Sequence, residues 1–95
     1  MPPDYDFAAA DQLGRQLAQL VDKLDWLINL RTGRRKALLG TAHSDNWQGG
    51  KRNKFESEFA RQQAALIELK AAARTLQASV AHATEQAHAA RKNGN

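Results

Sequence analysis

The chain has 95 residues, no cysteine and a formal net charge of +4. This length allows one small domain, and it leaves little room for a catalytic cleft beside a deep core. Without cysteine there is no disulfide framework and no thiolate metal site. The apolar runs are far shorter than the roughly 20 residues that cross a bilayer, and the acidic N-terminus does not resemble a Sec signal peptide, so we expect a soluble protein without a membrane span.

A first helix is predicted over residues about 6–42. Leucines recur three or four residues apart and form one apolar stripe, which Val21 and Ile28 widen. Asp4 or Asp6 is placed to cap the helix N-terminus. The stripe residues, which we expect at a helix–helix interface, are Leu13, Leu17, Leu20, Leu24 and Leu27.

The stripe is interrupted after Leu27, because the same spacing then reaches Arg31 and Arg34, with Gly33 between them. Glycine inside a helix costs about 1 kcal/mol relative to alanine. We therefore expect either a kink at 31–36 or a helix that continues there with this turn beyond the reach of its partner. Trp26 lies off the stripe and is expected to be either a flank contact to the partner helix or an exposed interaction residue.

The connection is predicted at residues about 43–51 and contains the sequence SDNWQGGK. Gly49 and Gly50 can supply the positive φ values of a tight reversal. Tryptophan is unusual in a turn, but between two antiparallel helices its indole can cover the last apolar layer while its N–H reaches a polar partner. We therefore predict that Trp47 acts as a lid over the end of the helices.

A second helix is predicted over residues about 52–91. Positions alternately four and three residues apart, starting at Phe55, are apolar in ten of eleven cases, as in a seam that packs against other helices. These positions are Phe55, Phe59, Gln62, Leu66, Leu69, Ala73, Leu76, Val80, Ala83, Ala87 and Ala90. Of these, the expected interface residues are Phe55, Phe59, Leu66, Leu69, Leu76 and Val80, while Glu58, Arg61, Glu68, Lys70 and Arg74 are expected to face water.

Together these elements predict an all-α protein: a single-domain, two-helix antiparallel hairpin spanning residues 1–95. Two helices that bury one stripe each enclose no core. We therefore expect the hairpin to pair with a copy of itself or with a related chain, as a four-helix bundle dimer.

Half of the fourteen lysines and arginines gather near the middle of the chain: Arg31, Arg34, Arg35, Lys36, Lys51, Arg52 and Lys54. This basic patch is either a solvated surface or a site for an acidic protein, anionic lipid or nucleic acid. A small basic helical protein that binds nucleic acid is therefore the alternative function. Against it, the connection is longer than that of a helix-turn-helix motif.

No catalytic, cofactor or metal site is expected. His82, Glu85 and His88 lie along one side of the second helix, but a metal site in a bundle needs further carboxylates from other helices, and the neighbouring seam is apolar. No phosphate-binding loop and no nucleophile–base arrangement is present.

The tripeptide Trp47-Gln48-Gly49, midway between two amphipathic helices in a cysteine-free chain, resembles the WxG family of small helical hairpins exported by type VII secretion systems, which are related to the early secreted antigenic target. The resemblance covers residues 8 to 90 and includes Phe55 and the seam of the second helix. It implies a dimeric four-helix bundle that is secreted, co-secreted or used for targeting, and it implies no enzymatic activity.

The resemblance also implies a partner and a location. The partner is a second copy or a related WxG-type hairpin, with the secretion machinery as a further partner, and the protein moves from the cytoplasm to the medium or cell surface. The family's export signal, a tyrosine followed four residues later by an acid after the second helix, is absent, since the only tyrosine is Tyr5. A partner can supply this signal for both chains. Many relatives are acidic whereas this chain is basic, so an acidic partner fits.

Overall fold

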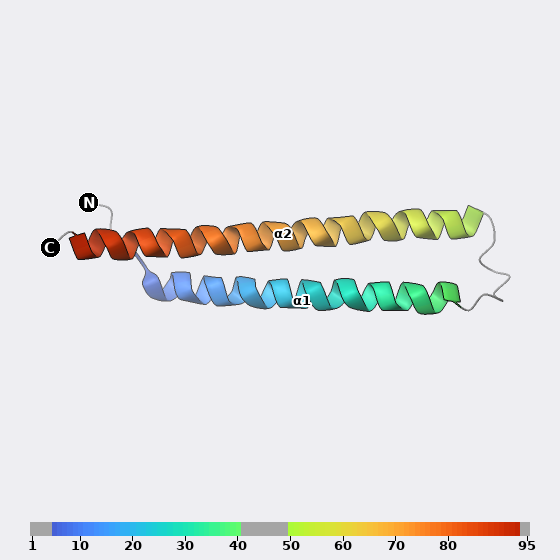
Figure 1. Ribbon diagram of the computed structural model, residues 1–95, viewed down its shortest axis with the longest axis horizontal. Coiled ribbons are helices and arrows are strands. Elements are labelled where there is room, and N and C mark those ends of the chain that lie inside the picture. Colours follow the sequence, from blue (N-terminus) through green and yellow to red (C-terminus); the bar gives the residue numbers. More distant parts are fainter. Residues whose placement is uncertain (1–4, 41–49, 94–95) are drawn as a thin grey trace.

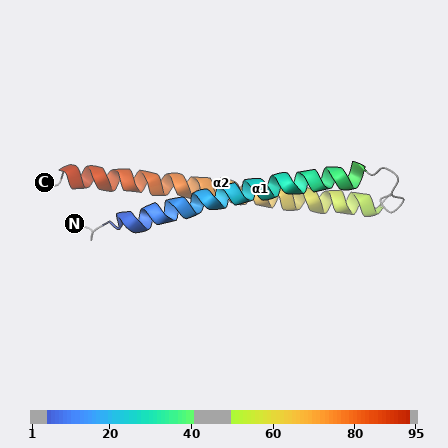
Figure 2. The same ribbon diagram turned by 90° about the horizontal axis from the view of Figure 1, so that it is seen from below.

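The computed structural model describes residues 5–40 and 50–93, which form two helices. α1 spans Phe7–Gly40 and α2 spans Gly50–Asn93. The helices lie antiparallel and cross at a shallow angle, in a rod of 73 × 18 × 15 Å (Figures 1 and 2). The predicted all-α helical hairpin is confirmed. We call the end where α1 ends and α2 begins the tip, and the opposite end the open end.

The observed helix bounds differ from the predicted ranges by a few residues. α1 is unbroken through Gly33, so the predicted alternative of a kink at 31–36 is wrong. A glycine in a helix keeps its backbone hydrogen bonds, and the good helix formers around it carry the turn. Gly50, expected in the turn, is the first residue of α2 and has no left-handed φ. Trp47 and Gly49 lie outside the described residues, so the predicted lid and turn stay predictions.

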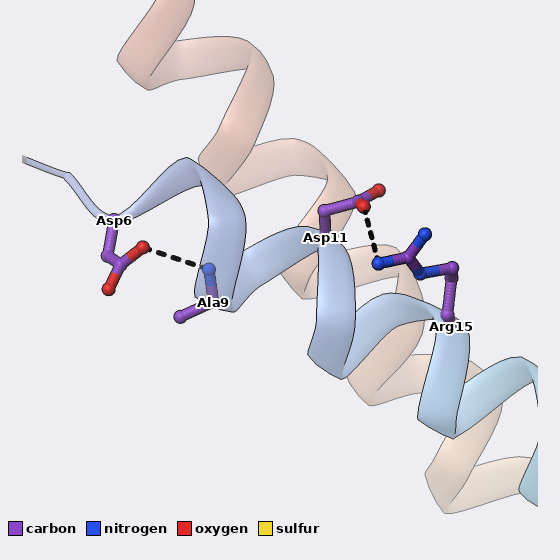
Figure 3. Close-up of polar contacts among 4 residues, drawn as sticks. All are labelled: Asp6, Ala9, Asp11 and Arg15. Atoms are coloured by element: carbon purple, nitrogen blue, oxygen red, sulfur yellow. Dashed lines mark hydrogen bonds and ion pairs between the residues drawn. The ribbon is translucent and has the colours of Figure 1, made fainter.

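The start of α1 is fixed by a side-chain cap. The Asp6 carboxylate accepts a hydrogen bond from the Ala9 backbone N–H at 2.9 Å, which satisfies one of the amides that a helix leaves without a partner in its first turn (Figure 3). Of the two predicted caps, Asp6 is the one used. One turn later, Arg15 pairs with Asp11 at 3.1 Å, but both side chains are largely exposed, so this pair contributes little stability.

The helices meet along a narrow apolar line. Among the described residues, four side chains are buried, each between 5 and 8% exposed: Leu17, Val21, Leu24 and Ala73. Val80 packs against this cluster from α2. None of the described side chains is fully enclosed. The hairpin therefore has a seam rather than a core, as expected for two helices that each bury one stripe.

Polar contacts along this line fix how the helices face each other. The ammonium group of Lys70 donates a hydrogen bond to the Asp25 carboxylate across the hairpin. Near the open end, the Tyr5 hydroxyl lies 2.7 Å from that of Thr84. Lys70, expected to face water, is instead half-buried, because its long aliphatic stem can cover the seam while its charge meets a carboxylate. The hydrogen bond from Lys70 lowers the pKa of Asp25 below 3.8, and the charges of Lys70 and Arg74 act in the same direction.

A lowered pKa in the folded state means that Asp25 stabilises the hairpin at pH values above its unfolded pKa, and that this contribution is lost as the pH falls through its folded pKa. We expect Asp25→Asn to lower the melting temperature at pH 7, and the difference from wild type to shrink below about pH 4. Circular dichroism melts at several pH values measure this. Asp22→Asn, an exposed change three residues away, is the control. A melting-temperature difference independent of pH would contradict the role of the ion pair.

Candidate interaction face

One long side of the hairpin carries two rows of apolar side chains that do not take part in the buried seam. In α1, Leu20 follows the buried Leu17 by three residues; in α2, Leu76 follows the buried Ala73 by three. Equal offsets from the contact line, in helices that run antiparallel, place both rows on the same side of the pair. We call this surface the leucine face; its members are Leu13, Leu20 and Leu27 from α1 and Leu69, Leu76 and Ala83 from α2.

The open groove at the tip supports this placement. Continuing each row by seven residues toward the tip leads from Leu27 to Arg34 and from Leu69 to Gln62. Both Arg34 and Gln62 line this one groove, together with Phe55. The leucine face therefore continues into a groove with apolar and cationic walls.

Large apolar side chains on this face are strongly exposed. Leu69 and Leu76 are 49% and 48% exposed, and Leu13 and Leu20 are 40% and 37% exposed. Single exposed leucines are ordinary on a protein surface, but aligned rows on both helices form one continuous apolar strip. Burying apolar surface is worth roughly 25 cal/mol per Å², so this strip favours association with another apolar surface.

The predicted interface residues thus divide into two groups. Those that make the contact within the hairpin are Leu17, Leu24, Phe59, Leu66 and Val80, which are buried or half-buried on the facing sides of the helices. The others flank that contact, and most lie on the leucine face. On the opposite flank, the line of α2 that faces α1 includes Gln63, Lys70 and Gln77, which the apolar pattern did not predict. The signal for them was their spacing of seven residues.

A polar cluster closes the seam toward the tip. The Arg31 guanidinium donates to the side-chain oxygens of Gln63 at 2.8 Å and Gln62 at 2.6 Å, and it lies over the Phe59 ring, 5.2 Å from the centroid. Gln63 in turn donates to the Ile28 carbonyl oxygen at 3.2 Å. The turn at Arg31 is therefore within reach of α2, contrary to our expectation. An arginine replaces a leucine here because its guanidinium can stack on an aromatic ring while its N–H groups find acceptors.

The basic patch is consequently smaller than predicted. Arg35 also lies against the Phe59 ring and pairs with Glu56 at 2.7 Å. Arg31 and Arg35 are therefore engaged between the helices. The remaining cations of the patch are exposed around the tip: Arg34, Lys36, Lys51, Arg52 and Lys54.

Two large apolar residues lie away from the leucine face. Trp26 is 65% exposed, which matches the second of its two predicted roles, an exposed residue. Ile67 is 53% exposed on α2. Ile67 follows the contact residue Leu66 by one position, which places it on the side of the hairpin opposite the leucine face.

The predicted line of histidines serves packing in part. The His88 ring stacks on Phe7 with centroids 4.3 Å apart, and Arg91 lies over the same Phe7 ring. Within residues 5–40 and 50–93, no group of three or more histidine or acidic side chains is arranged to hold a metal ion. Neither described helix is apolar enough over sufficient length to cross a membrane.

Comparisons with protein-family models, with curated proteins and with solved structures gave no match for this chain.

The leucine face is tested by placing a charge on it. We expect Leu76→Asp to abolish self-association or partner binding and to leave the isolated hairpin folded, because Leu76 is half-exposed and lies outside the buried seam. Ile67→Asp is the matched control, since it places the same charge at an equally exposed apolar residue on the opposite side. Analytical ultracentrifugation and circular dichroism measure assembly and helix content. Equal loss of assembly in both variants would show that the face is wrongly assigned.

Proposed function

We propose that this protein is a helical-hairpin interaction protein associated with type VII secretion, which acts as a dimer with itself or with a related hairpin. The observation that carries the proposal is a two-helix rod whose seam buries only four described side chains and whose leucine face is left exposed. Such a hairpin gains stability when a second apolar surface covers that face, and a four-helix bundle is the usual result.

The secretion role is supported by the sequence between the helices. Trp47, Gln48 and Gly49 lie between the end of α1 and the start of α2, the position of the WxG tripeptide in the family that the chain resembles. The hairpin, the absence of cysteine and the chain length agree with that resemblance. The function is binding: the protein is carried by the secretion machinery alone or together with its partner, and it acts outside the cell or at its surface.

Export is the direct test of the secretion role. An epitope-tagged copy is expressed in the source organism, with and without the type VII secretion ATPase, and the medium and cell fractions are compared by immunoblot. We expect the tagged chain in the medium or cell-surface fraction only when the ATPase is present, and we expect Trp47→Ala to reduce that fraction. Export that does not depend on the ATPase, or retention with a cytoplasmic marker in both strains, would refute the proposal.

The tip also favours a second candidate, nucleic-acid binding, because exposed cations surround it. The proposed interaction role predicts no submicromolar binding of duplex DNA at physiological salt, since no aromatic residue is interleaved with the exposed cations for stacking. Fluorescence anisotropy over a range of salt concentrations measures this. Tight binding that weakens steeply with salt and is lost on neutralising Arg34, Lys51 and Arg52 would favour the second candidate.

A further inference from the structure

Charge is distributed unevenly along the rod. The described tip half, residues 28–40 and 50–67, contains eight cations and two acids, a net charge of +6. The described open half, residues 5–27 and 68–93, contains six cations and six acids and is neutral. Two copies that packed with their tips together would bring two charges of +6 side by side, and like-charge repulsion opposes that arrangement. A pair with the tips at opposite ends avoids it.

The α1 row of the leucine face has a matching asymmetry. Extended by seven residues in each direction, it starts at an acid and ends at a base. It reads Asp6, Leu13, Leu20, Leu27 and Arg34. If two copies of this row run antiparallel about a twofold axis at Leu20, Leu13 meets Leu27, and Asp6 meets Arg34 at both ends. The row is therefore complementary to its own reverse, which is what an interface between identical subunits requires.

The α2 row agrees with an axis at this level. Leu17 and Val21 pack with Ala73 and Val80, and Asp25 pairs with Lys70, so Leu20 and Leu76 lie at about the same height along the rod. Leu69 and Ala83 lie seven residues to either side of Leu76. The apolar part of the face is thus centred on one level in both helices. The same axis brings each cationic groove at the tip beside the open end of the other copy.

The two residues at the ends of the α1 row are accessible for such a contact. Arg34 is exposed, and none of the carboxylates among the described residues lies within ion-pair distance of it. Asp6 is exposed as well; one of its oxygens caps α1, and its charge remains (Figure 3).

We propose that the leucine face is covered by a second copy of this chain, antiparallel to the first, with the twofold axis at the level of Leu20 and Leu76 and with Arg34 of each copy facing Asp6 of the other. This rests on the proposed role as a dimeric interaction protein and names the partner.

Spin-label distances test the orientation, because the chain has no cysteine and single cysteines can be introduced without background. Lys36→Cys places a label on the exposed tip, 16 residues from the axis. At about 1.5 Å per residue, two such labels are about 48 Å apart along an antiparallel dimer and adjacent along a parallel one. Gln19→Cys, one residue from the axis, is the control and gives a short distance. A short Lys36→Cys distance would overturn the proposal.

The charge contact is tested by a variant whose effect has opposite signs in the two arrangements. In the antiparallel dimer, Arg34→Glu places two acids together and weakens self-association several-fold at low salt, with a smaller effect at high salt. In a parallel dimer the same change reduces repulsion between the tips and strengthens it. Lys36→Glu makes the same charge change on the outer side of α1 and leaves the dissociation constant within about twofold. Dissociation constants come from sedimentation equilibrium.

The oligomeric state separates this inference from the proposed function. A helical monomer at tens of micromolar would overturn the second copy as partner, and if the same chain is exported only with the ATPase present, the secretion role stands with a different partner. Conversely, an antiparallel dimer that is never exported would support the inference and refute the secretion role.

Discussion

The structure depends on one geometric constraint: two helices in contact can each bury only a narrow strip of their surfaces. Here the strip is filled by Leu17, Val21 and Leu24 from α1 and by Ala73 from α2. The small alanine lets α2 approach α1 closely at mid-length, and larger residues from α1 fill the space around it. Every other apolar residue must be covered from outside the hairpin or remain in water. The exposed leucine face is a direct consequence of this constraint.

Polar groups determine which apolar residues enter the strip. Lys70 reaches Asp25, and Arg31 reaches Gln63, so the side of α2 that carries Gln63 and Lys70 turns toward α1. This rotation moves Leu69 and Leu76 outward. A salt bridge with one half-exposed partner contributes little stability by itself, but it distinguishes between two rotations of similar apolar burial. The polar contacts therefore act on the specificity of the helix pairing more than on its strength.

Function follows from what is left over. The described residues of the hairpin hold neither an enclosed pocket nor a gathered set of titratable groups, and their main unsatisfied feature is an apolar strip that ends in a cationic groove. An apolar strip supplies affinity, whereas charges at its ends supply orientation. Association through this surface explains both features together, and neither is needed for the hairpin itself to form.

The sequence by itself determined that the chain forms two amphipathic helices in a hairpin, because the three-and-four spacing of Leu13 to Leu27 and of Phe55 to Val80 fits only a helical period. It also placed the cap at Asp6 as one of two choices. Only the tertiary structure decided which half of each apolar stripe faces the other helix. A stripe wider than one contact line allows several rotations, and the choice depends on pairs far apart in sequence, such as Asp25 with Lys70. For the same reason Arg31 and Arg35, read along the chain as surface cations, belong to the space between the helices, where the Phe59 ring receives them.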